Sequence, residues 1–449
     1  MIEKRQHFTT YAKMLQIITT LVSAFILILI MERKPVIGLI IAIMTATLGE
    51  LGRLPDWTNL PYLINDLFLP FLIFVWILKK IALQRNFKIP PLLLPILVWI
   101  LIAALSLMIN ASWQEGVLYL VRFIEYFFLY LITVDEIKQD EKNRKFLFAS
   151  IVIGALLVSF FGLLQLKYYP SFYDLNMMEE GWDPHINRLL STWFDPNFVG
   201  GFLAFIICIL FGIQISDKKF YKHPLLFISS LFLLFSLYLT YSRSAYLACG
   251  IGILVITALK SRKLFLLGML TVTILFVTLG KAQERFLDLW ESAKSILVQD
   301  GFNSYFNPDA TSRLRVDSWQ NALAIIKENF WFGCGYNAYK YSAWKLGMVA
   351  DLEEHSSTGS DSSLLNIFAT TGIFGFVAYL WFYMKALIIG FKNKTDGYNL
   401  GLTGALIALL AHATFVNSLL FPHMLVFFWI SLGLLNASPN TPAHLSSRT

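Results

Sequence analysis

Four arginines lie at the borders between apolar and polar segments, where their side chains can reach an anion. Arg188 precedes an apolar run in INRLLSTWFDPNFVGGFLAF, and Arg243 lies in LTYSRSAYL, the tightest turn of the chain. Arg313 and Arg315 belong to the polar segment TSRLRVDSWQNALAIIKENFWFGCG. A guanidinium binds a phosphate or pyrophosphate group through two parallel hydrogen bonds. These side chains therefore indicate a site for a substrate that carries a diphosphate.

A carboxylate and an imidazole lie downstream of these arginines. Asp361, in SDSSLLNIF, directly precedes an apolar run, and His355 belongs to the polar segment EEHSSTGS. Partial burial at a membrane edge raises the pKa of a carboxyl group, so Asp361 could act as a general base toward a hydroxyl group. The alternative is a structural role, in which Asp361 caps the following helix and His355 is a solvated loop residue.

Several classes of chemistry have no matching motif in the chain. It contains no phosphate-binding loop, dinucleotide fingerprint, HExxH motif or CxxC pair. Its three cysteines make no disulfide framework. We therefore expect no metal and no other cofactor, and we expect a substrate that is activated beforehand. A glycan linked to a lipid through a diphosphate, presented in the outer leaflet, meets these conditions.

The elements that must position these residues are membrane helices. The chain is 57% hydrophobic and 14% charged, whereas soluble domains carry roughly 25% charged residues. Apolar runs near the length of a bilayer recur throughout, and they do not alternate as barrel strands do. The sequence predicts an all-α, polytopic protein of the cell membrane with about 12 transmembrane helices. The expected spans are 14–31, 36–49, 62–78, 91–109, 114–133, 146–166, 197–215, 224–240, 245–259, 264–280, 362–389, 400–420 and 422–436.

Lysine and arginine in the short loops indicate the orientation. Basic loops follow the spans that end near residues 78, 133, 215, 259 and 389, and the predicted spans place these loops on one side, which we assign to the cytoplasm. The net charge of +7 fits this signal and contact with lipid headgroups, not nucleic-acid binding. Arg243 then faces outward, against the positive-inside rule, which favours a functional role for it.

The large loop 281–361 falls on the outer side. It contains 8 Lys and Arg against 11 Asp and Glu, as expected for a translocated segment. We expect it to contain an amphipathic helix that Thr311 or Ser312 caps and that Gly333 and Gly335 terminate. The apolar stripe of this helix follows a spacing of three to four residues: Val316, Trp319, Leu323, Ile326 and Phe330.

One charged pair lies inside a predicted span. Arg122 and Glu125 in LYLVRFIEYFFLYL are three residues apart, which places them on one helix face. Ionisable groups inside a membrane are costly and mark functional sites or structural pairs. We interpret these two residues as an ion pair that locks helices together, with a functional role as the alternative.

The ordered motifs resemble the O-antigen ligase and polymerase family of bacterial membrane proteins. The matching pieces are RLLSTWFDPNFVGGFLA, LTYSRSAYL, SRLRVDSWQNALAIIKENFWFGCGYNAY and SDSSLLNIFATTGIFG. Within a single integral membrane domain, 1–449, the resemblance covers a core at 163–387. It implies a metal-independent glycosyltransferase that moves a glycan from an undecaprenyl-diphosphate donor to an acceptor sugar. It also implies that Arg243 holds the donor diphosphate and that Arg188 and Arg313 match further arginines of the family.

The chain departs from this family at one position. Ligases of the family usually show a His-Asn pair about eleven residues before the Gly-x-x-Gly that ends the last motif, and counting back from Gly372 this chain has Asp361 followed by Ser362 there. The base is then Asp361, or His355 has taken over that role. The departure favours a polymerase-type member, such as those for teichuronic acid or other surface polysaccharides, over a ligase.

Two other functions compete with glycan transfer. A flippase or exporter of lipid-linked oligosaccharide would show repeat symmetry and charge at the bilayer midplane. No repeat is detectable, and most polar motifs lie on the outer side. A non-catalytic scaffold for other polysaccharide assembly proteins would bind the same partners without needing the polar loop. The one-sided distribution of polar residues favours the enzyme.

Overall fold

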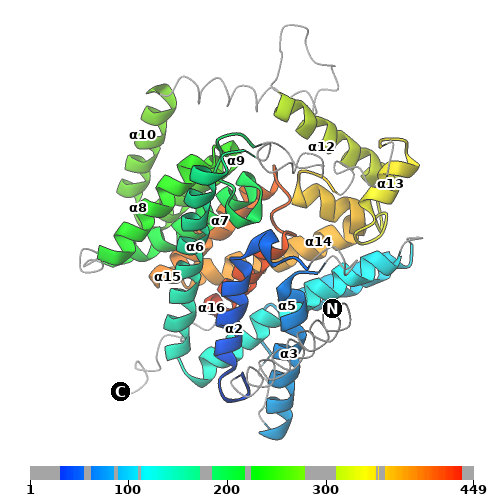
Figure 1. The fold of residues 1–449 in the computed structure, drawn as a ribbon, viewed down its shortest axis with the longest axis horizontal. Helices are drawn as coiled ribbons and strands as arrows, with labels where there is room; N and C mark the ends of the chain where they lie inside the picture. The colour runs from blue at the N-terminus through cyan, green and yellow to red at the C-terminus, as the bar shows by residue number, and fades with distance from the viewer. Residues whose placement is uncertain are drawn as a thin grey trace, which may run out of the picture.

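The computed structural model describes residues 31–54, 62–84, 89–109, 113–171, 185–217, 224–278, 310–349, 352 and 359–436. Helices dominate this part of the chain, and its five long apolar helices support an all-helical membrane protein (Figure 1). The long α-helices that fall on expected spans are α5 Trp113–Gln139, α6 Lys142–Tyr168, α7 Pro196–Ser216, α9 Arg243–Lys260 and α14 Ser363–Lys392. Each of these has a stretch long and apolar enough to cross a bilayer.

Further helices also fall on expected spans. They are α2 Pro35–Ala46, α3 Ile64–Ala82, α4 Leu93–Leu107, α8 Pro224–Leu239, α10 Arg262–Thr278, α15 Gly397–Ala413 and α16 Pro422–Asn436. Several of these are apolar but shorter than 18 residues, and the expected span 14–31 lies almost wholly outside the described residues. The count of about twelve spans therefore stays a prediction.

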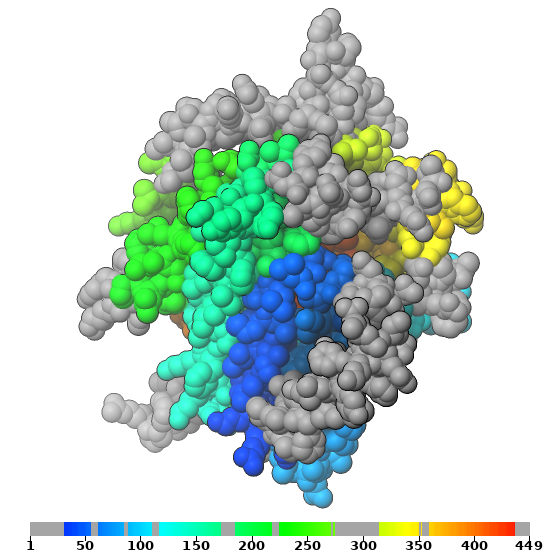
Figure 2. All heavy atoms as spheres, in the orientation of Figure 1, coloured from blue at the N-terminus to red at the C-terminus, as the bar shows by residue number. Residues whose placement is uncertain are grey.

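Helices α7, α9 and α15 form the tightest packing in the described bundle. Glycines allow their backbones to approach: a methyl group on Gly212 would lie 2.2 Å from the Cα of Gly401. Small residues have this role in membrane helix pairs, where close contact between backbones replaces the hydrophobic effect. Around this core, α16 packs on α5, α14 on α4, and α2 lies beside α6 on the face shown in Figure 2.

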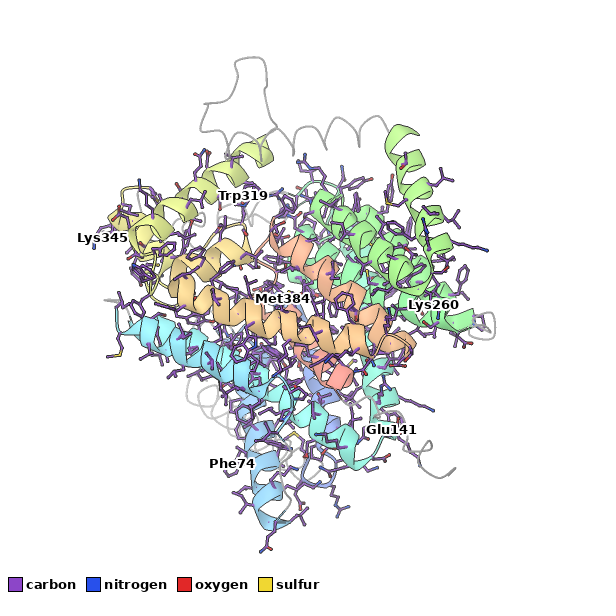
Figure 3. All side chains as sticks on the ribbon, turned by 180° about the vertical axis from the view of Figure 1, so that it is seen from behind. Phe74, Glu141, Lys260, Trp319, Lys345 and Met384 are labelled. Atoms are coloured by element: carbon purple, nitrogen blue, oxygen red, sulfur yellow. The ribbon has the colours of Figure 1, made fainter. Side chains whose placement is uncertain are left out.

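The basic loops predicted on one side are connected by ion pairs. Lys80 at the end of α3 pairs with Asp135 at the end of α5, and Arg144 at the start of α6 pairs with Asp396, which caps α15. We call this side the lysine end. Figure 3 shows Glu141 and Lys260 on the side of the molecule opposite Trp319 and Lys345.

The large loop contributes two described helices, α12 Ala310–Glu328 and α13 Tyr339–Lys345. In Figure 1 they lie across the upper right of the molecule, above α14, with which α12 is in contact. Residues 279–309 and most of 350–358 lie outside the described residues. The amphipathic helix of the loop is present, but it begins at Ala310, so Thr311 and Ser312 lie inside its first turn and do not cap it.

The buried face of α12 differs from the predicted stripe. Val316 and Ile326 are buried as expected, but Leu323 and Phe330 are each 42% exposed. Ala322 and Ile325 are fully buried in their place. The helix ends at Glu328, five residues before Gly333, so the two glycines do not terminate it.

Candidate functional site

The segment before α7 is held in one conformation by its own polar side chains. Phe194 adopts a left-handed backbone (φ 57°), and the Asp195 side chain then accepts hydrogen bonds from the backbone N–H of Asn197 (2.6 Å) and Phe198 (3.1 Å). Asp195 is therefore the N-cap that the sequence predicts, with Pro196 as the first helical residue. A left-handed aromatic residue is strained, and such strain is concentrated at functional sites.

The Arg188 guanidinium connects this segment to the turn between α8 and α9. Its Nε donates to the carbonyl of Thr240 (3.0 Å) and its Nη2 to Oδ1 of Asn197 (3.3 Å). The same Asn197 oxygen accepts a hydrogen bond from the Ser242 hydroxyl (3.0 Å). Two of the arginine motifs, more than 50 residues apart in sequence, thus meet at one place.

Arg243 is the first residue of α9, directly after this turn, and it is half-buried. The turn contains Tyr241 in a left-handed conformation (φ 50°), followed by Ser242, whose hydroxyl lies 3.3 Å from that of Ser244. The N-terminus of a helix carries partial positive charge and exposed N–H groups, which favour anions. Arg243 and the start of α9 therefore present positive charge beside Arg188.

Helix α12 is fixed over this region by backbone contacts with α14. Gly372 interrupts α14 with φ 66° and ψ −171°, and the loop after α12 fits against that kink. Three hydrogen bonds join the two backbones: Cys334 N to Ala369 O (2.9 Å), Gly335 N to Thr370 O (3.1 Å) and Ile373 N to Phe330 O (2.8 Å). This contact places α12, and with it Arg315, in a defined position.

Glycine is required on both sides of this contact. A methyl group on Gly333 would lie 2.4 Å from the carbonyl carbon of Thr370, and one on Gly372 would lie 2.3 Å from the carbonyl oxygen of Trp331. Gly333 also has a positive φ of 74°. The glycines of the FGCG and TTGIFG sequences therefore bring two backbones together, which explains why Gly333 and Gly335 do not stop the helix.

Arg315 faces the end of α15. It is close enough to the His412 imidazole for an electrostatic interaction, and His412 also lies near the backbone of Asn197. His412 is fully buried, and its Nδ1 lies 3.1 Å from the Ser418 hydroxyl. The ring packs on Gly201 of α7, where a methyl group would lie 2.6 Å from it. His412 therefore connects Arg315 to the segment that holds Arg188. We call the side of the molecule with Arg188, Arg243 and Arg315 the arginine end.

Asp361 lies next to this group but does not cap α14. The N-cap is Ser362, whose hydroxyl accepts from Leu365 N (3.4 Å), so the predicted cap is displaced by one residue. The backbone N–H of Asp361 donates to the Ser318 hydroxyl of α12 (2.9 Å), and the Asp361 side chain is exposed. Ser318 follows Arg315 by three residues, so both lie on one side of α12. Burial raises the pKa of Tyr339, and the charges of Cys334 and Asp361 raise it further.

The side chains of two predicted site residues are not described. The backbone of Arg313 belongs to the first turn of α12, but its side chain is not described. His355 lies in 353–358, which is outside the described residues altogether. Their proposed roles in substrate binding stay predictions.

The partner that we assigned to Arg122 is wrong. Arg122 forms a two-pronged ion pair with Asp66 of α3, through Nε to Oδ1 (3.0 Å) and Nη2 to Oδ2 (2.7 Å). Asp66 lies in the first turn of α3 and also accepts from the backbone N–H of Leu63 (2.9 Å). Arg122 therefore connects α5 to α3 through Asp66, and Glu125 does not form the salt bridge.

The sequence did not predict a contact between the carboxylate of Glu50 and the imidazole of His423. Glu50, in the 3-10 helix η1 Gly49–Gly52, lies 3.1 Å from Nε2 of His423 and also pairs with Arg53. A carboxylate has only acceptors, so the His423 N–H donates. Burial acts to raise the pKa of Glu50, but the hydrogen bond and charge of His423 together with Arg53 outweigh it, and the pKa is lowered from its usual 4.5.

The described arrangement can bind an anion and hold an exposed carboxylate nearby. Arg188, Arg243 and Arg315 supply guanidiniums, and the backbone of Asp361 is bonded to Ser318, which lies on the same side of α12 as Arg315. Among the described side chains, no group of three His, Cys, Asp or Glu could hold a metal ion. The geometry is compatible with chemistry at a diphosphate, in which positive charge stabilises the leaving group.

Comparison with protein-family models gives a match. A family model described as O-antigen ligase matches residues 228–380, about a third of the chain. The matched region includes Arg243, Arg313, Arg315 and Asp361, whereas Arg188 precedes it. The matched region lies wholly within the predicted core 163–387. No curated protein matches the chain.

Proposed function

We propose that this chain, whose residues 228–380 match the family model described as O-antigen ligase, polymerises or ligates a surface polysaccharide. The donor is a glycan on undecaprenyl diphosphate, the acceptor is a sugar hydroxyl, and the reaction takes place on the outer side of the membrane. One observation carries the proposal. Arg188 bonds to Asn197 and Thr240, and so brings the first arginine motif against the turn that contains Arg243.

The proposed roles follow from this arrangement. Arg188, Arg243, Arg313 and Arg315 bind the diphosphate of the donor and stabilise the charge that develops on it as the glycosidic bond breaks. Asp361 accepts the proton of the attacking hydroxyl, because its side chain is exposed and its backbone is bonded to Ser318, one helical turn after Arg315 on α12. His412, which lies within electrostatic reach of Arg315, helps to position it. The leaving group is undecaprenyl diphosphate, which keeps both of its phosphate groups.

The Arg122–Asp66 pair disfavours the flippase alternative. Asp66 belongs to the first turn of α3, so the charged pair lies toward one end of the bundle. Transporters of this size place binding charges near the bilayer midplane. The pair is better explained as a contact between helices.

A transfer assay in membranes tests the proposal. The substrate is a diphosphate-linked oligosaccharide on a polyprenyl lipid, and the proteins are wild type, Arg243→Ala, Asp361→Ala and, as a matched arginine of the lysine end, Arg262→Ala. We expect wild type and Arg262→Ala to extend the glycan in ladders of repeat units. Loss of a preorganised charge donor costs roughly 100- to 1,000-fold in rate, and loss of a general base costs a similar factor.

Equal amounts of each protein in the membrane are verified by immunoblotting. A single transfer to another lipid or to a protein, with the same dependence on Arg243, identifies a ligase instead of a polymerase. Donor that crosses the bilayer without any glycosyl transfer would overturn the proposed function in favour of a flippase.

A further inference from the structure

A polar cavity of 340 Å³ lies beside the arginine end and takes no part in the arginine site. Its walls come from η1, the start of α5, the start of α7, the turn at 336–337, the first half of α14 and the loop before α16. Small-molecule sites in proteins range from roughly 300 to 1,000 Å³, so the cavity belongs to the small end of that range. We call it the amide cavity after two of its residues, Asn366 and Asn417.

These two asparagines have polar atoms that the described protein does not satisfy. Asn366 is only 8% exposed, and its side-chain Oδ1 has no hydrogen-bond partner among the described residues. Oδ1 of Asn417 is likewise buried without a described partner. The two amides approach the same point, since a methyl group on Gly359 would lie 3.5 Å from Asn366 and 3.6 Å from Asn417. An unsatisfied buried amide is unfavourable, and a ligand that forms hydrogen bonds with it would remove that cost.

The charged residues of the amide cavity are already paired. Arg122 binds Asp66, and Arg53 binds Glu50 through Nε (2.8 Å) and Nη2. Glu50 therefore holds Arg53 at the wall, while His423 holds Glu50. Paired arginines still offer N–H donors, but they offer little net charge. This balance favours a ligand rich in hydroxyl groups over a phosphate.

Aromatic rings complete the wall. Phe198 and Phe421 stack face to face, with centroids 3.9 Å apart and planes 7° from parallel, and both line the cavity. Tyr119, which is 39% exposed, lines it as well and lies over the Arg122 guanidinium. Aromatic faces beside amides and guanidiniums suit a sugar ring, which has apolar C–H faces and a rim of hydroxyl groups.

The amide cavity adjoins the arginine site through two short stretches of chain. Phe198 directly follows Asn197, which binds Arg188, and Asn417 directly precedes Ser418, which lies against His412. We propose that the amide cavity binds the acceptor. The part of the acceptor that it holds is the terminal sugar of the glycan that is extended. This inference rests on the proposed function, because glycan transfer requires a sugar site next to a diphosphate site.

Binding to the full-length protein in detergent tests this assignment without requiring turnover. The sugar probes are glucose, galactose, N-acetylglucosamine and glucuronic acid, observed by saturation-transfer NMR, and undecaprenyl diphosphate is the second probe. The variants are Asn366→Ala, Asn417→Ala and Arg243→Ala. Asn399→Ala is the matched control, since Asn399 is a fully buried amide whose two polar atoms lack described hydrogen-bond partners, and it does not line the cavity.

We expect at least one sugar to bind wild type and Asn399→Ala equally. Removal of either cavity amide should weaken its affinity about tenfold, because one to two hydrogen bonds are lost. Binding of undecaprenyl diphosphate should stay unchanged in these two variants and should weaken in Arg243→Ala. Thermal unfolding verifies that each variant is folded. If Asn366→Ala is not folded, the sugar affinity of Asn417→Ala tests the assignment.

Two results separate the failures. The amide cavity assignment is overturned if no sugar binds wild type, or if the folded asparagine variants bind sugar as wild type does. If sugars bind with the expected dependence on the asparagines but undecaprenyl diphosphate does not bind wild type, the proposed donor is wrong and the sugar site stands.

Discussion

The two ends of the bundle are held together by different kinds of contact. At the lysine end, ion pairs join helix termini, as in Lys80 with Asp135 and Arg144 with Asp396. At the arginine end, backbone contacts dominate: Gly333 and Gly372 bring α12 onto α14, and neutral oxygens receive the two described hydrogen bonds of Arg188. Ion pairs between long side chains adjust to small displacements, whereas backbone contacts fix positions closely. The arginine end is therefore the part of the protein built for precise placement of charge.

The largest effect should follow from substitution of Gly372. The conformation of this residue (φ 66°, ψ −171°) is restricted to glycine, and a methyl group would also lie 2.3 Å from the Trp331 carbonyl. We expect Gly372→Ala to lose several kcal/mol of stability, of which about 1–3 kcal/mol is backbone strain. Thermal unfolding of the purified protein measures this loss, and limited proteolysis measures the release of α12.

Gly347→Ala is the matched control for that substitution. Gly347 also has a positive φ of 69°, but nothing lies within 4 Å of an added methyl group. Its substitution should lower the stability only by the strain of a left-handed backbone, about 1–2 kcal/mol. Equal losses in the two variants would show that the contact between α12 and α14 contributes nothing to stability.

Substitution of an ion-paired arginine gives an intermediate effect, which depends on how buried the pair is. Arg122 and Asp66 have side chains 13% and 5% exposed, so removal of Arg122 leaves a buried carboxylate and should cost about 3–5 kcal/mol. Arg144 and Asp396 are 18% and 38% exposed, so Arg144→Ala should cost about 1 kcal/mol or less. Unfolding by denaturant in micelles compares the two variants.

The double variant Arg122→Ala/Asp66→Ala sharpens this comparison. If the pair acts as a unit, the double variant should be less destabilised than the sum of the two single variants. Additive losses would mean that Arg122 and Asp66 stabilise the fold through separate contacts.

The smallest effect concerns the pH dependence of Glu50. Because the pKa of Glu50 is lowered in the folded protein, its stabilising contribution is complete above pH 4.5, the usual value of the carboxyl group. That contribution decreases as the pH falls below 4.5 and is lost below the folded pKa. We expect Glu50→Gln to unfold at a lower temperature than wild type at pH 6, with the difference shrinking toward pH 3. A difference that is constant across this range would contradict the ionic role of Glu50.

The helices were predictable from the sequence because each signal is local. Apolar runs place α2 to α10 and α14 to α16 within a few residues, and Asp195-Pro196 correctly predicts the start of α7. The motif residues Arg188 and Arg243 were also recognisable, because arginine beside an apolar run is unusual on the outer side of a membrane. What brings them together is the Asn197 side chain, which on its own looked like part of a helix cap.

The contacts between distant segments were not predictable in the same way. Asp66 lies in an apolar run 56 residues before its partner Arg122, and Glu50 lies 373 residues before His423. The Gly372 kink lies within one continuous apolar run, so hydropathy gives no sign of it. A signal did exist for the amide cavity, since Asn366 is a polar residue inside an apolar span. Only the fold reveals that Asn417 lies beside it.

The contact between Glu50 and His423 has a consequence for biogenesis. A membrane protein is synthesised and inserted from its N-terminus, yet His423 and His412 belong to the last part of the chain. Glu50 and Arg315 cannot form these contacts until α15 and α16 have been inserted. A nascent chain still on the ribosome, or one truncated before residue 412, lacks these contacts. These contacts of Glu50 and Arg315 therefore form only after α15 and α16 have been synthesised.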